Sequence, residues 1–381
     1  MSAKKRKVFE EVGEASSETA PLPQPGLIDR APKGARRAIR LWLTGLFALV
    51  ALMILVGGLT RLTDSGLSIT EWKPLTGALP PMSEAAWQAE FDAYRQIPEY
   101  RLVNKGMSLA EFKSIYWWEW GHRQLGRLIG LVWGAGFLFF WFTGRIPPGW
   151  TGRLFGLGVL GGAQGAIGWW MVSSGLSGRM VDVASYRLAI HLGLAFVILG
   201  LIVWYVLLLA RQEAEILQMR RARERKLFSM STGLMHLAFL QILLGALVAG
   251  IDAGRGYIDW PLMNGQFIPD EIFDYEPWWS NFFENPALVQ FIHRMAGYLL
   301  VIFALAVWWR SRPSGNRAVR GAFDLVAAMA VLQMLLGIVA VMTAAQLHAA
   351  LTHQAGAILL WVLILRARFR AGYPPAQSIR T

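Results

Sequence analysis

The feature that most constrains the fold is a series of apolar runs, each about 20 residues long. Such a run, if helical, matches the roughly 30 Å hydrocarbon core of a bilayer at about 1.5 Å per residue. Polar faces at helical period, typical of soluble helices, do not interrupt these runs. The sequence therefore predicts an all-α integral membrane protein with eight transmembrane helices, at residues 39–59, 117–143, 153–173, 186–210, 229–250, 287–309, 321–343 and 349–366.

The distribution of basic residues predicts how the chain sits in the membrane. The net charge is +12, which is also typical of nucleic-acid-binding proteins. When Lys and Arg are assigned to alternate sides of the eight spans, 25 lie on the side of both termini, eight on the other side and four inside the spans. The positive-inside rule then places both termini in the cytoplasm. We expect a multi-pass protein of a bacterial inner membrane that contacts lipids and not nucleic acid.

The chain has no cysteine, which excludes disulfides, iron–sulfur clusters and thiolate ligands. Its first residues mix basic, acidic and proline residues, which fits neither a signal peptide nor a transit peptide. We therefore expect a disordered cytoplasmic tail. The predicted organisation is a tail at 1–37, an N-terminal half at 38–210, a basic linker at 211–228, a C-terminal half at 229–366 and a tail at 367–381.

The two predicted halves repeat the same polar residues at matching positions. Shared composition of membrane helices is the simpler explanation, but it does not account for motifs that recur at the same topological places. We therefore expect two pseudo-two-fold-related four-helix bundles about an axis near the membrane normal. The repeated motifs are Asp64-Ser65-Gly66 and Asp252-Ala253-Gly254, His122-Arg123 with Gly126 and His293-Arg294 with Gly297, Gln164 with Gly168 and Gln333 with Gly337, and His191 and His353.

Four membrane histidines follow this repeat: His122 and His191 in the first half, and His293 and His353 in the second. The members of a pair enter from the outer face at similar depth, roughly 8 Å below it. Two imidazoles at one depth on neighbouring helices can hold the metal of a flat macrocycle. A single membrane histidine more often makes a structural hydrogen bond. Because four recur at matched depth, we predict that they ligate haem iron.

Two other histidines are weaker candidates. His236 lies near the cytoplasmic end of its span, where we expect a hydrogen bond between helices. His348 lies at the outer mouth of the last span, either solvated or in the place of His353. We favour His353 because it aligns with His191.

Three arginines lie next to the predicted ligands: Arg123 and Arg294 follow their histidines, and Arg187 precedes His191 by one turn. Haem carries two propionates, which guanidinium groups bind well at low dielectric, so we predict that these arginines contact the cofactor. Trp117, Trp118 and Trp120 offer flat apolar surface near the first pair, or belong to an interfacial belt.

The halves differ three residues before the histidine of the second helix. The first half has Glu119 and the second has Gln290. A carboxylate beside a haem suits proton transfer or stabilisation of positive charge, whereas an amide does not titrate. We therefore predict that Glu119, His122 and His191 form the reactive site, with a structural pair between Glu119 and Arg123 as the alternative.

Two long outer loops, 60–116 and 251–286, complete the predicted structure. Loops of this length are usually functional, and these would cover the haem pockets or form docking surfaces. Ser83, with Glu84 after it, is typical of a capped helix start.

Taken together, the motifs resemble the haem A synthases of the alphaproteobacterial and mitochondrial type. The resemblance covers about residues 38 to 366. It rests on Thr60-Arg61-Leu62-Thr63-Asp64-Ser65-Gly66-Leu67-Ser68, Glu71-Trp72-Lys73-Pro74, Glu119-Trp120-Gly121-His122-Arg123, Asp252-Ala253-Gly254-Arg255, Trp260-Pro261-Leu262-Met263-Asn264-Gly265 and Phe291-Ile292-His293-Arg294.

That resemblance implies oxidation of the C8 methyl group of haem O to a formyl group, which gives haem A for terminal oxidases. It implies a haem b cofactor at His293 and His353, and substrate haem O at His122 and His191 with Glu119 as the nearby acid. It also implies haem O synthase as the source of substrate, cytochrome oxidase assembly factors as partners and an electron donor of unknown identity. Some members carry cysteine pairs in the outer loops, and this chain has none.

Two other functions stay open at this point. One is a two-haem b-type electron carrier, which needs two equivalent haems and no role for Glu119. The other is a non-enzymatic haem transport or assembly protein, which binds haem and leaves it unchanged. The sequence also leaves open a homo-oligomer, the oxidant, the protonation steps and the route by which haem enters.

Overall fold

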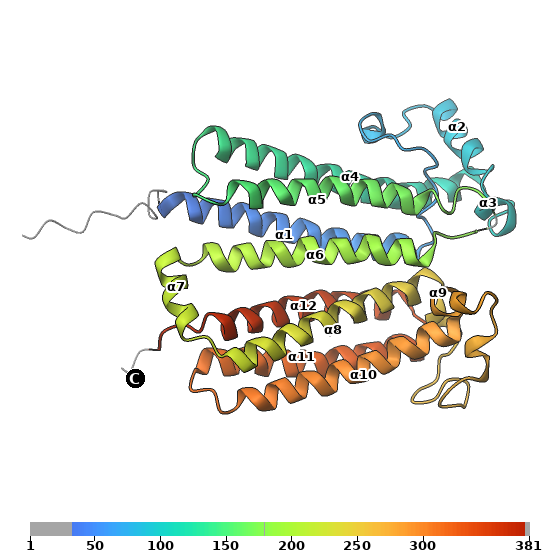
Figure 1. Ribbon diagram of the computed structural model, residues 1–381. Helices are drawn as coiled ribbons and strands as arrows, with labels where there is room; N and C mark the ends of the chain where they lie inside the picture. Colours follow the sequence, from blue (N-terminus) through green and yellow to red (C-terminus); the bar gives the residue numbers. More distant parts are fainter. Residues whose placement is uncertain (1–32, 179, 378–381) are drawn as a thin grey trace, which may run out of the picture.

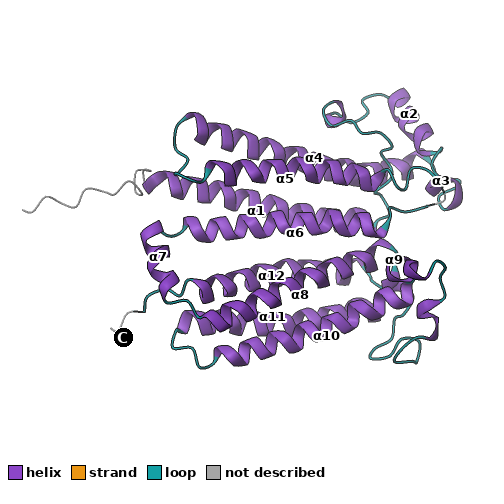
Figure 2. Cartoon of the chain, in the orientation of Figure 1, coloured by secondary structure: helices purple, strands orange, loops and turns teal. Residues whose placement is uncertain are grey.

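The computed structural model describes residues 33–178 and 180–377, which form helices joined by loops (Figures 1 and 2). Within these ranges there is no β-strand, and one isolated bridge joins Met263 and Gln266. Residues 1–32 of the expected N-terminal tail and residues 378–381 of the expected C-terminal tail lie outside the described residues. Residues 33–37 form the first turn of a helix, so this helix begins earlier than the expected boundary at residue 38.

Eight helices of 22 residues or more cover the eight apolar runs. They are α1 (Lys33–Leu62), α4 (Leu109–Phe142), α5 (Thr151–Val172), α6 (Ser185–Leu209), α8 (Arg225–Gly250), α10 (Pro286–Ser311), α11 (Arg317–Met342) and α12 (Leu347–Gly372). Seven of them are long and apolar enough to cross a membrane, which establishes a multi-pass helical membrane protein.

Seven of the eight expected spans are therefore candidates, and α5 is the exception. This helix forms where it was predicted, but it is not among the seven candidate spans within the described residues. Its sequence holds seven glycines and Gln164, and these residues lower the mean hydropathy below that of the other long helices.

Short helices make up the outer loops and one connection at the opposite end. They are η2 (Thr76–Ala78), α2 (Glu84–Tyr94), α3 (Pro98–Leu102), α7 (Glu213–Arg221), η3 (Ala253–Arg255), η4 (Asp270–Phe273), η5 (Trp278–Ser280) and α9 (Asn281–Glu284). The predicted cap at Ser83 is confirmed, because its hydroxyl accepts from the amide of Ala86. A capping box between Ser108 and Glu111 begins α4 before the apolar run, so this helix extends beyond the expected span.

The long helices contact one another in two sets. In the first, α1 and α5 each contact α4 and α6; in the second, α8 and α11 each contact α10 and α12. The sets meet where α6 contacts α8 and α12, and where α1 contacts α12. At this junction the indole of Trp361 donates to the carbonyl of Phe196 across the α12–α6 crossing, at 3.1 Å. Membrane helices associate through such close packing and interhelical hydrogen bonds.

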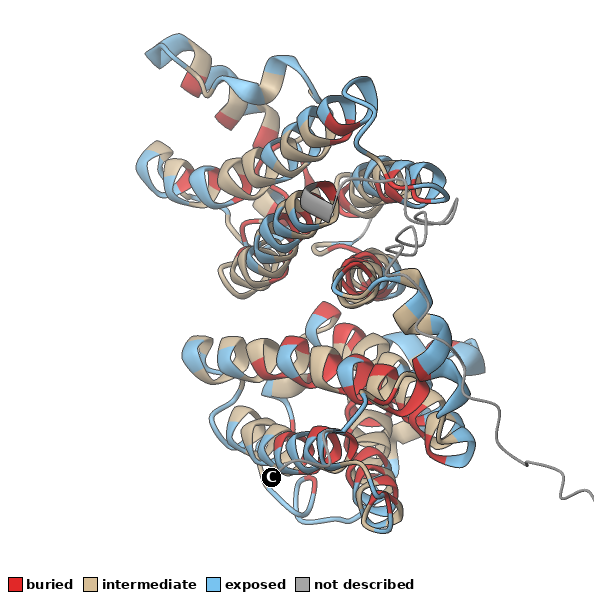
Figure 3. Cartoon of the chain, turned by 90° about the vertical axis from the view of Figure 1, so that its left-hand side faces the viewer, coloured by how far each residue is buried: buried red, intermediate tan, exposed pale blue. Residues whose placement is uncertain are grey.

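Buried residues, red in Figure 3, lie mostly where the long helices adjoin one another, and exposed residues lie mostly on their outer sides. Ile39, Leu43, Leu199 and Ile364 are almost fully buried in one core cluster that includes both sets. Large apolar residues such as Ile302 and Trp309 lie exposed on the outside. An apolar exterior is expected where lipid surrounds the protein.

The two ends of the helices differ in what they carry. α1 begins and α12 ends at the same end, where α7 also lies and where Arg36 donates to the carbonyl of Arg211 (Figure 1). The long loops with α2, α3 and α9 lie at the other end. The cavity described next opens between the helices toward these loops.

Candidate functional site

One cavity of about 390 Å³ is lined by all four predicted ligands, His122, His191, His293 and His353. The four side chains come from α4, α6, α10 and α12. Arg61, Asp252 and Trp260 also line the cavity, so segments at the start of both outer loops cover it. The structure thus brings both histidine pairs to one continuous space.

The imidazoles of His293 and His353 face each other across this cavity. Their ring centroids are 6.5 Å apart and the ring planes are 85° apart. Bonds between a metal and an imidazole nitrogen are about 2 Å long, so one metal ion fits between rings at this separation. The part of the chain that the structure describes holds no group of three or more His, Asp or Glu side chains placed to bind a metal ion. Ligand pairs suit a metal whose other four ligands come from a macrocycle.

Each of the four imidazoles packs against a glycine of a neighbouring helix. A β-carbon added at the glycine would lie 2.8 to 3.2 Å from the imidazole Cε1, closer than side chains pack, so any larger residue would displace the ring. The contacts pair Gly57 with His122, Gly168 with His191, Gly245 with His293 and Gly337 with His353.

A glutamine amide contacts three of the four imidazoles, one turn before the glycine on the same helix. The amide nitrogens of Gln164, Gln241 and Gln333 lie 3.2, 3.1 and 3.1 Å from Nδ1 of His191, His293 and His353, respectively. Each amide also donates to the backbone carbonyl of its histidine, at 2.8 to 3.0 Å. Partners of this kind fix the orientation of a ligating imidazole.

Sequence reasoning noticed Gln164 and Gln333 but missed Gln241. The signal was present, because each glutamine precedes its glycine by four residues, in Gln164/Gly168, Gln241/Gly245 and Gln333/Gly337. Residues four apart share a helix face. At the fourth place, before Gly57, the chain has Met53.

Of the three arginines predicted to contact propionates, Arg123 and Arg294 mainly hold the outer loops, and Arg187 contacts the end of α5. Arg123 donates to the carbonyls of Ile69 and Glu71, and Arg294 donates to those of Tyr257, Asp259 and Leu262. Arg187 donates to the carbonyl of Trp170. Arg294 alone of the three lines the histidine cavity.

Glu119 is buried and its carboxylate accepts four hydrogen bonds. One oxygen accepts from the Ser68 hydroxyl at 2.7 Å and the Ile69 amide at 2.8 Å, and the other accepts twice from Arg123. The pair between Glu119 and Arg123 therefore forms, and it holds residues 68–71 of the first outer loop against α4. Glu119 is not among the residues that line the histidine cavity. Gln290 takes the equivalent place in the second half, where it accepts from Arg294 and donates to the carbonyl of Tyr257.

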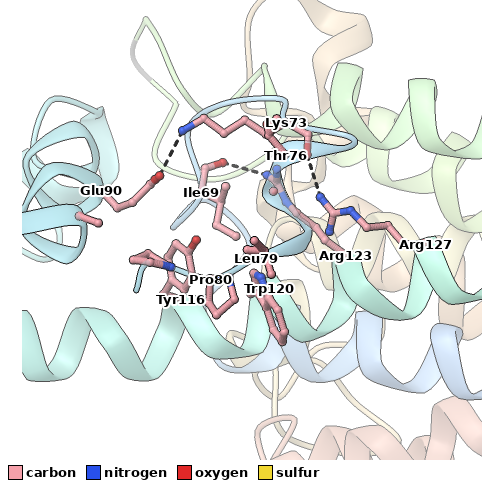
Figure 4. A pocket seen from close by; sticks show the side chains of 13 residues that line it. Ile69, Lys73, Thr76, Leu79, Pro80, Glu90, Tyr116, Trp120, Arg123 and Arg127 are labelled. Atoms are coloured by element: carbon pink, nitrogen blue, oxygen red, sulfur yellow. Dashed lines mark hydrogen bonds and ion pairs between the residues drawn. The ribbon is translucent and has the colours of Figure 1, made fainter. Parts of the chain in front are cut away.

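A second cavity, of about 270 Å³, lies between α4 and the loop of residues 69–81. Figure 4 shows Lys73 reaching Glu90 and Arg127 donating to the carbonyl of Lys73. Hydrogen bonding to Glu71 is the main cause that raises the pKa of the Lys73 ammonium. Trp120 lines this second cavity, whereas Trp117 and Trp118 are exposed. None of the three tryptophans lines the histidine cavity, although a place near the first histidine pair was one of the two expectations for them.

Arg61 is a site residue that sequence reasoning missed. It lines the cavity from the end of α1 and pairs with Asp64 and Asp252, both at 2.8 Å. The two aspartates hold the same place in the repeated Asp-x-Gly motif, and both adopt a left-handed backbone, with φ of 48° and 51°. One arginine thus contacts the equivalent residue of each half. The sequence did contain a signal for this role. Arg61 precedes Asp64 by three residues, but the residue three places before Asp252 is Ala249, so the arginine has no counterpart in the second half.

The two weaker histidine candidates lie away from the cavity lining. His236 is exposed and its Nδ1 lies 2.9 Å from the carbonyl of Thr232, in its own helix, so the expected bond between helices is wrong. His348 is exposed at the start of α12.

Comparisons of this chain with protein families and with known proteins agree with each other. Residues 40–365 match the COX15-CtaA family, described as cytochrome oxidase assembly protein. A protein of Ruegeria sp. (strain TM1040) named "Heme A synthase" is 64% identical over 377 residues, which is 98% of this chain and 99% of that protein. A protein of the same name from Paracoccus denitrificans (strain Pd 1222) is 65% identical over 379 residues, 99% of this chain and 98% of the relative.

Proposed function

The chain belongs to the COX15-CtaA family, and from this membership and the paired histidines we propose that it is a haem A synthase, a membrane oxidoreductase. It oxidises the C8 methyl group of haem O to a formyl group and so provides haem A for terminal cytochrome oxidases. The observation that carries the proposal is the single cavity that both histidine pairs line. An enzyme that uses one haem as substrate and another as cofactor needs two such pairs in reach of each other.

His293 and His353 suit a permanent haem b. Their rings stand at a separation that admits one metal ion, and a glutamine amide and a glycine contact each ring. When bound there, haem b would supply a one-electron redox centre. His293 and His353 would hold the haem, and their fixed orientation with the apolar lining of the cavity would help to set its potential.

His122 and His191 would hold substrate haem O in the first half. Their glycine contacts at Gly57 and Gly168 leave the rings facing the cavity. Glu119 lies three residues before His122 and is the carboxylate of this half. In this proposal Glu119 places negative charge beside the substrate and, with Arg123, keeps the Ser68–Ile69 segment against α4.

Arg123, Arg187 and Arg294 enter the proposal as the positive groups nearest the haem propionates. Arg123 and Arg294 donate mostly to loop carbonyls and Arg187 donates to a carbonyl at the end of α5, so each would present its charge while it also holds a neighbouring segment in place. Arg294 has the most direct access because it lines the cavity.

In the membrane, we propose that α5 crosses together with the seven apolar helices and that the two sets are pseudo-two-fold-related four-helix bundles. α5 contacts α4 and α6, which supports its place as a fourth member of the first set. The basic linker 211–228 and both termini would lie in the cytoplasm of a bacterial inner membrane. Haem O would come from haem O synthase, and haem A would pass to the oxidase with the help of assembly factors.

The electron-carrier alternative requires equivalent halves, and the halves are not equivalent. The first half has Glu119 where the second half has Gln290, and it has Met53 where the second half has Gln241. These differences fall at residues next to His122 and His293. They are expected if one haem reacts and leaves while the other stays.

The proposal is tested by expressing the full chain in cells that make haem O but have no other enzyme that converts it. Haem is then extracted and identified by mass. Wild type should accumulate haem A or its hydroxylated precursor, and Glu119→Ala should yield much less. Glu84→Ala, an exposed carboxylate on α2, is the matched control and should behave as wild type. Recovery of unmodified haem alone from wild type would contradict the proposal.

A further inference from the structure

The environment of His122 differs from that of the other three ligands. Its Nδ1 is buried, and no hydrogen-bond partner for it occurs among residues 33–178 and 180–377. At the other three rings a glutamine amide lies within 3.2 Å of Nδ1. The difference therefore concerns the atom that sets which imidazole nitrogen carries the proton and how firmly the ring is held.

Met53 is the residue that replaces the glutamine. It precedes Gly57 by four residues, as Gln241 precedes Gly245, and these glycines contact His122 and His293. A second contact supports the equivalence. The Met53 methyl group would meet a β-carbon added at Gly126, and the Gln241 amide would meet one added at Gly297. Met53 and Gln241 thus occupy the same place in the two halves.

The chemical difference between these side chains is large. An amide supplies a strong acceptor and two donors, whereas a thioether is a weak acceptor and donates nothing. The amide oxygens of all three glutamines have no partner among the described residues. A turned amide would let its oxygen accept from Nδ1–H, in place of the bond that its nitrogen donates to the carbonyl of the same histidine. An imidazole that donates from Nδ1 is fixed in the tautomer that offers Nε2 to a metal and is a stronger base.

From these contacts we propose, on the basis of the proposed function, that His122 is the exchangeable axial ligand of the substrate haem and that Met53 makes it so. An iron with four pyrrole nitrogens and two imidazoles has no free position, so a substrate haem can enter, react at its iron or leave only if one imidazole gives way. His191 keeps its glutamine and stays bound. His293 and His353 both keep their glutamines, so both would stay bound to the second haem.

Carbon monoxide is a suitable probe because it binds ferrous haem only after an axial ligand has left. The full chain is purified in detergent with its bound haem, reduced and mixed with carbon monoxide, and the absorbance change gives rate and stoichiometry. Wild type should bind one carbon monoxide per chain. Met53→Gln should slow this binding by roughly 10- to 100-fold, the usual effect of an outer-shell hydrogen bond on a metal ligand. Met53→Leu has no amide and should keep the wild-type rate.

The reciprocal change gives an independent arm. Gln241→Met removes the amide from His293 and should open a second carbon monoxide site, for two per chain. Equal rates for Met53→Gln and Met53→Leu, or binding to both haems in wild type, would overturn the inference. These results are separate from the proposed function. If no haem A forms while the carbon monoxide pattern is as predicted, it is the proposed function that fails.

Discussion

Arg61 and Asp252 form a 2.8 Å ion pair that joins the end of α1 to the turn after α8. The arginine side chain is largely buried, at 12% exposure, and it also donates to the carbonyl of Ala249 at 3.0 Å. Arg61 therefore holds the second half through two contacts at the edge of the cavity. These contacts add a polar link to the packing of α6 and α1 against α8 and α12.

Loss of the Asp252 charge should weaken the contact between the halves. Asp252→Asn keeps a residue that tolerates the left-handed backbone at φ 51°, so the change reports on the ion pair and not on strain. We expect a loss of about 1–3 kcal/mol in the free energy of unfolding, measured by thermal denaturation of the haem-loaded protein in detergent. Asp64→Asn has the same backbone and the same distance to Arg61, but lies in one half and is more exposed. It should cost less than about 1 kcal/mol. Equal losses would show that the link between halves does not matter.

The glycine contacts predict which substitutions expel haem. In Gly245→Ala the added methyl group would lie 3.0 Å from Cε1 of His293, so the ring must move away from its partner His353. We expect the haem content per chain to fall to about half, since one site is lost, as measured by the pyridine haemochrome. Gly233→Ala on the same helix meets only the Phe303 ring at 3.4 Å and should keep full haem content. Full haem content in Gly245→Ala would contradict the close-packed ligand site.

The choice between His353 and His348 as the second-half ligand has a direct test. His353 lines the cavity, contacts Gly337 and faces His293, whereas His348 is exposed. His353→Ala should lose the second-half haem, and His348→Ala should keep it with an unchanged absorption spectrum. If the two variants lose haem to the same extent, His353 is not the ligand.

Glu99 in α3 predicts a pH dependence of the first outer loop. Burial, and then the charges of Asp182, Glu119 and Asp64, raise the pKa of its carboxyl to about 8. Because the folded-state pKa lies above the unfolded value of about 4.5, the folded loop holds an extra proton between these values. The contribution of Glu99 to the stability of the folded loop is therefore greatest below pH 4.5. It falls as the pH rises to about 8 and does not change further above that pH.

The expected loss between pH 5 and 8 is on the order of 3 kcal/mol for opening of α2 and α3. Hydrogen exchange of the 84–102 amides, expressed as protection factors, measures it. Glu99→Gln should remove the pH dependence. Glu84→Gln, an exposed carboxylate on α2, should leave it in place. The interpretation fails if Glu99→Gln retains the wild-type profile.

The long helices were predictable because the length of an apolar run is set by the thickness of the bilayer. Their ends were less so. α12 continues to Gly372 through a segment with Arg366, Arg368 and Arg370, which read as a charged tail. Ala367, Phe369 and Ala371 alternate with these arginines and are buried, and Arg368 donates to the hydroxyl of Thr232. Long cationic side chains can extend away from an apolar face, so their charge did not mark the end of the helix.

The pairing of His293 with His353 was predictable from the repeat, because equal spacing in equivalent helices gives equal depth. That both pairs line one cavity was not predicted. The contacts of the arginines did not follow. Arg123 and Arg294 donate to loop carbonyls, and the path of an irregular loop cannot be read from residue types. Arg61 was missed for a similar reason, because its contact with Asp252 depends on how the halves pack together.

The most direct test of the central claim identifies the haem that each half holds. The full chain is purified from cells supplied with haem O, as wild type, as His122→Ala/His191→Ala and as His293→Ala/His353→Ala, and the bound haem is extracted and weighed by mass spectrometry. The account predicts haem b together with haem O or its oxidised products in wild type. The first double variant should hold haem b alone and form no haem A, and the second should lack haem b. Two unmodified haems of one kind in wild type, lost equally in either variant, would contradict it and would favour an electron carrier.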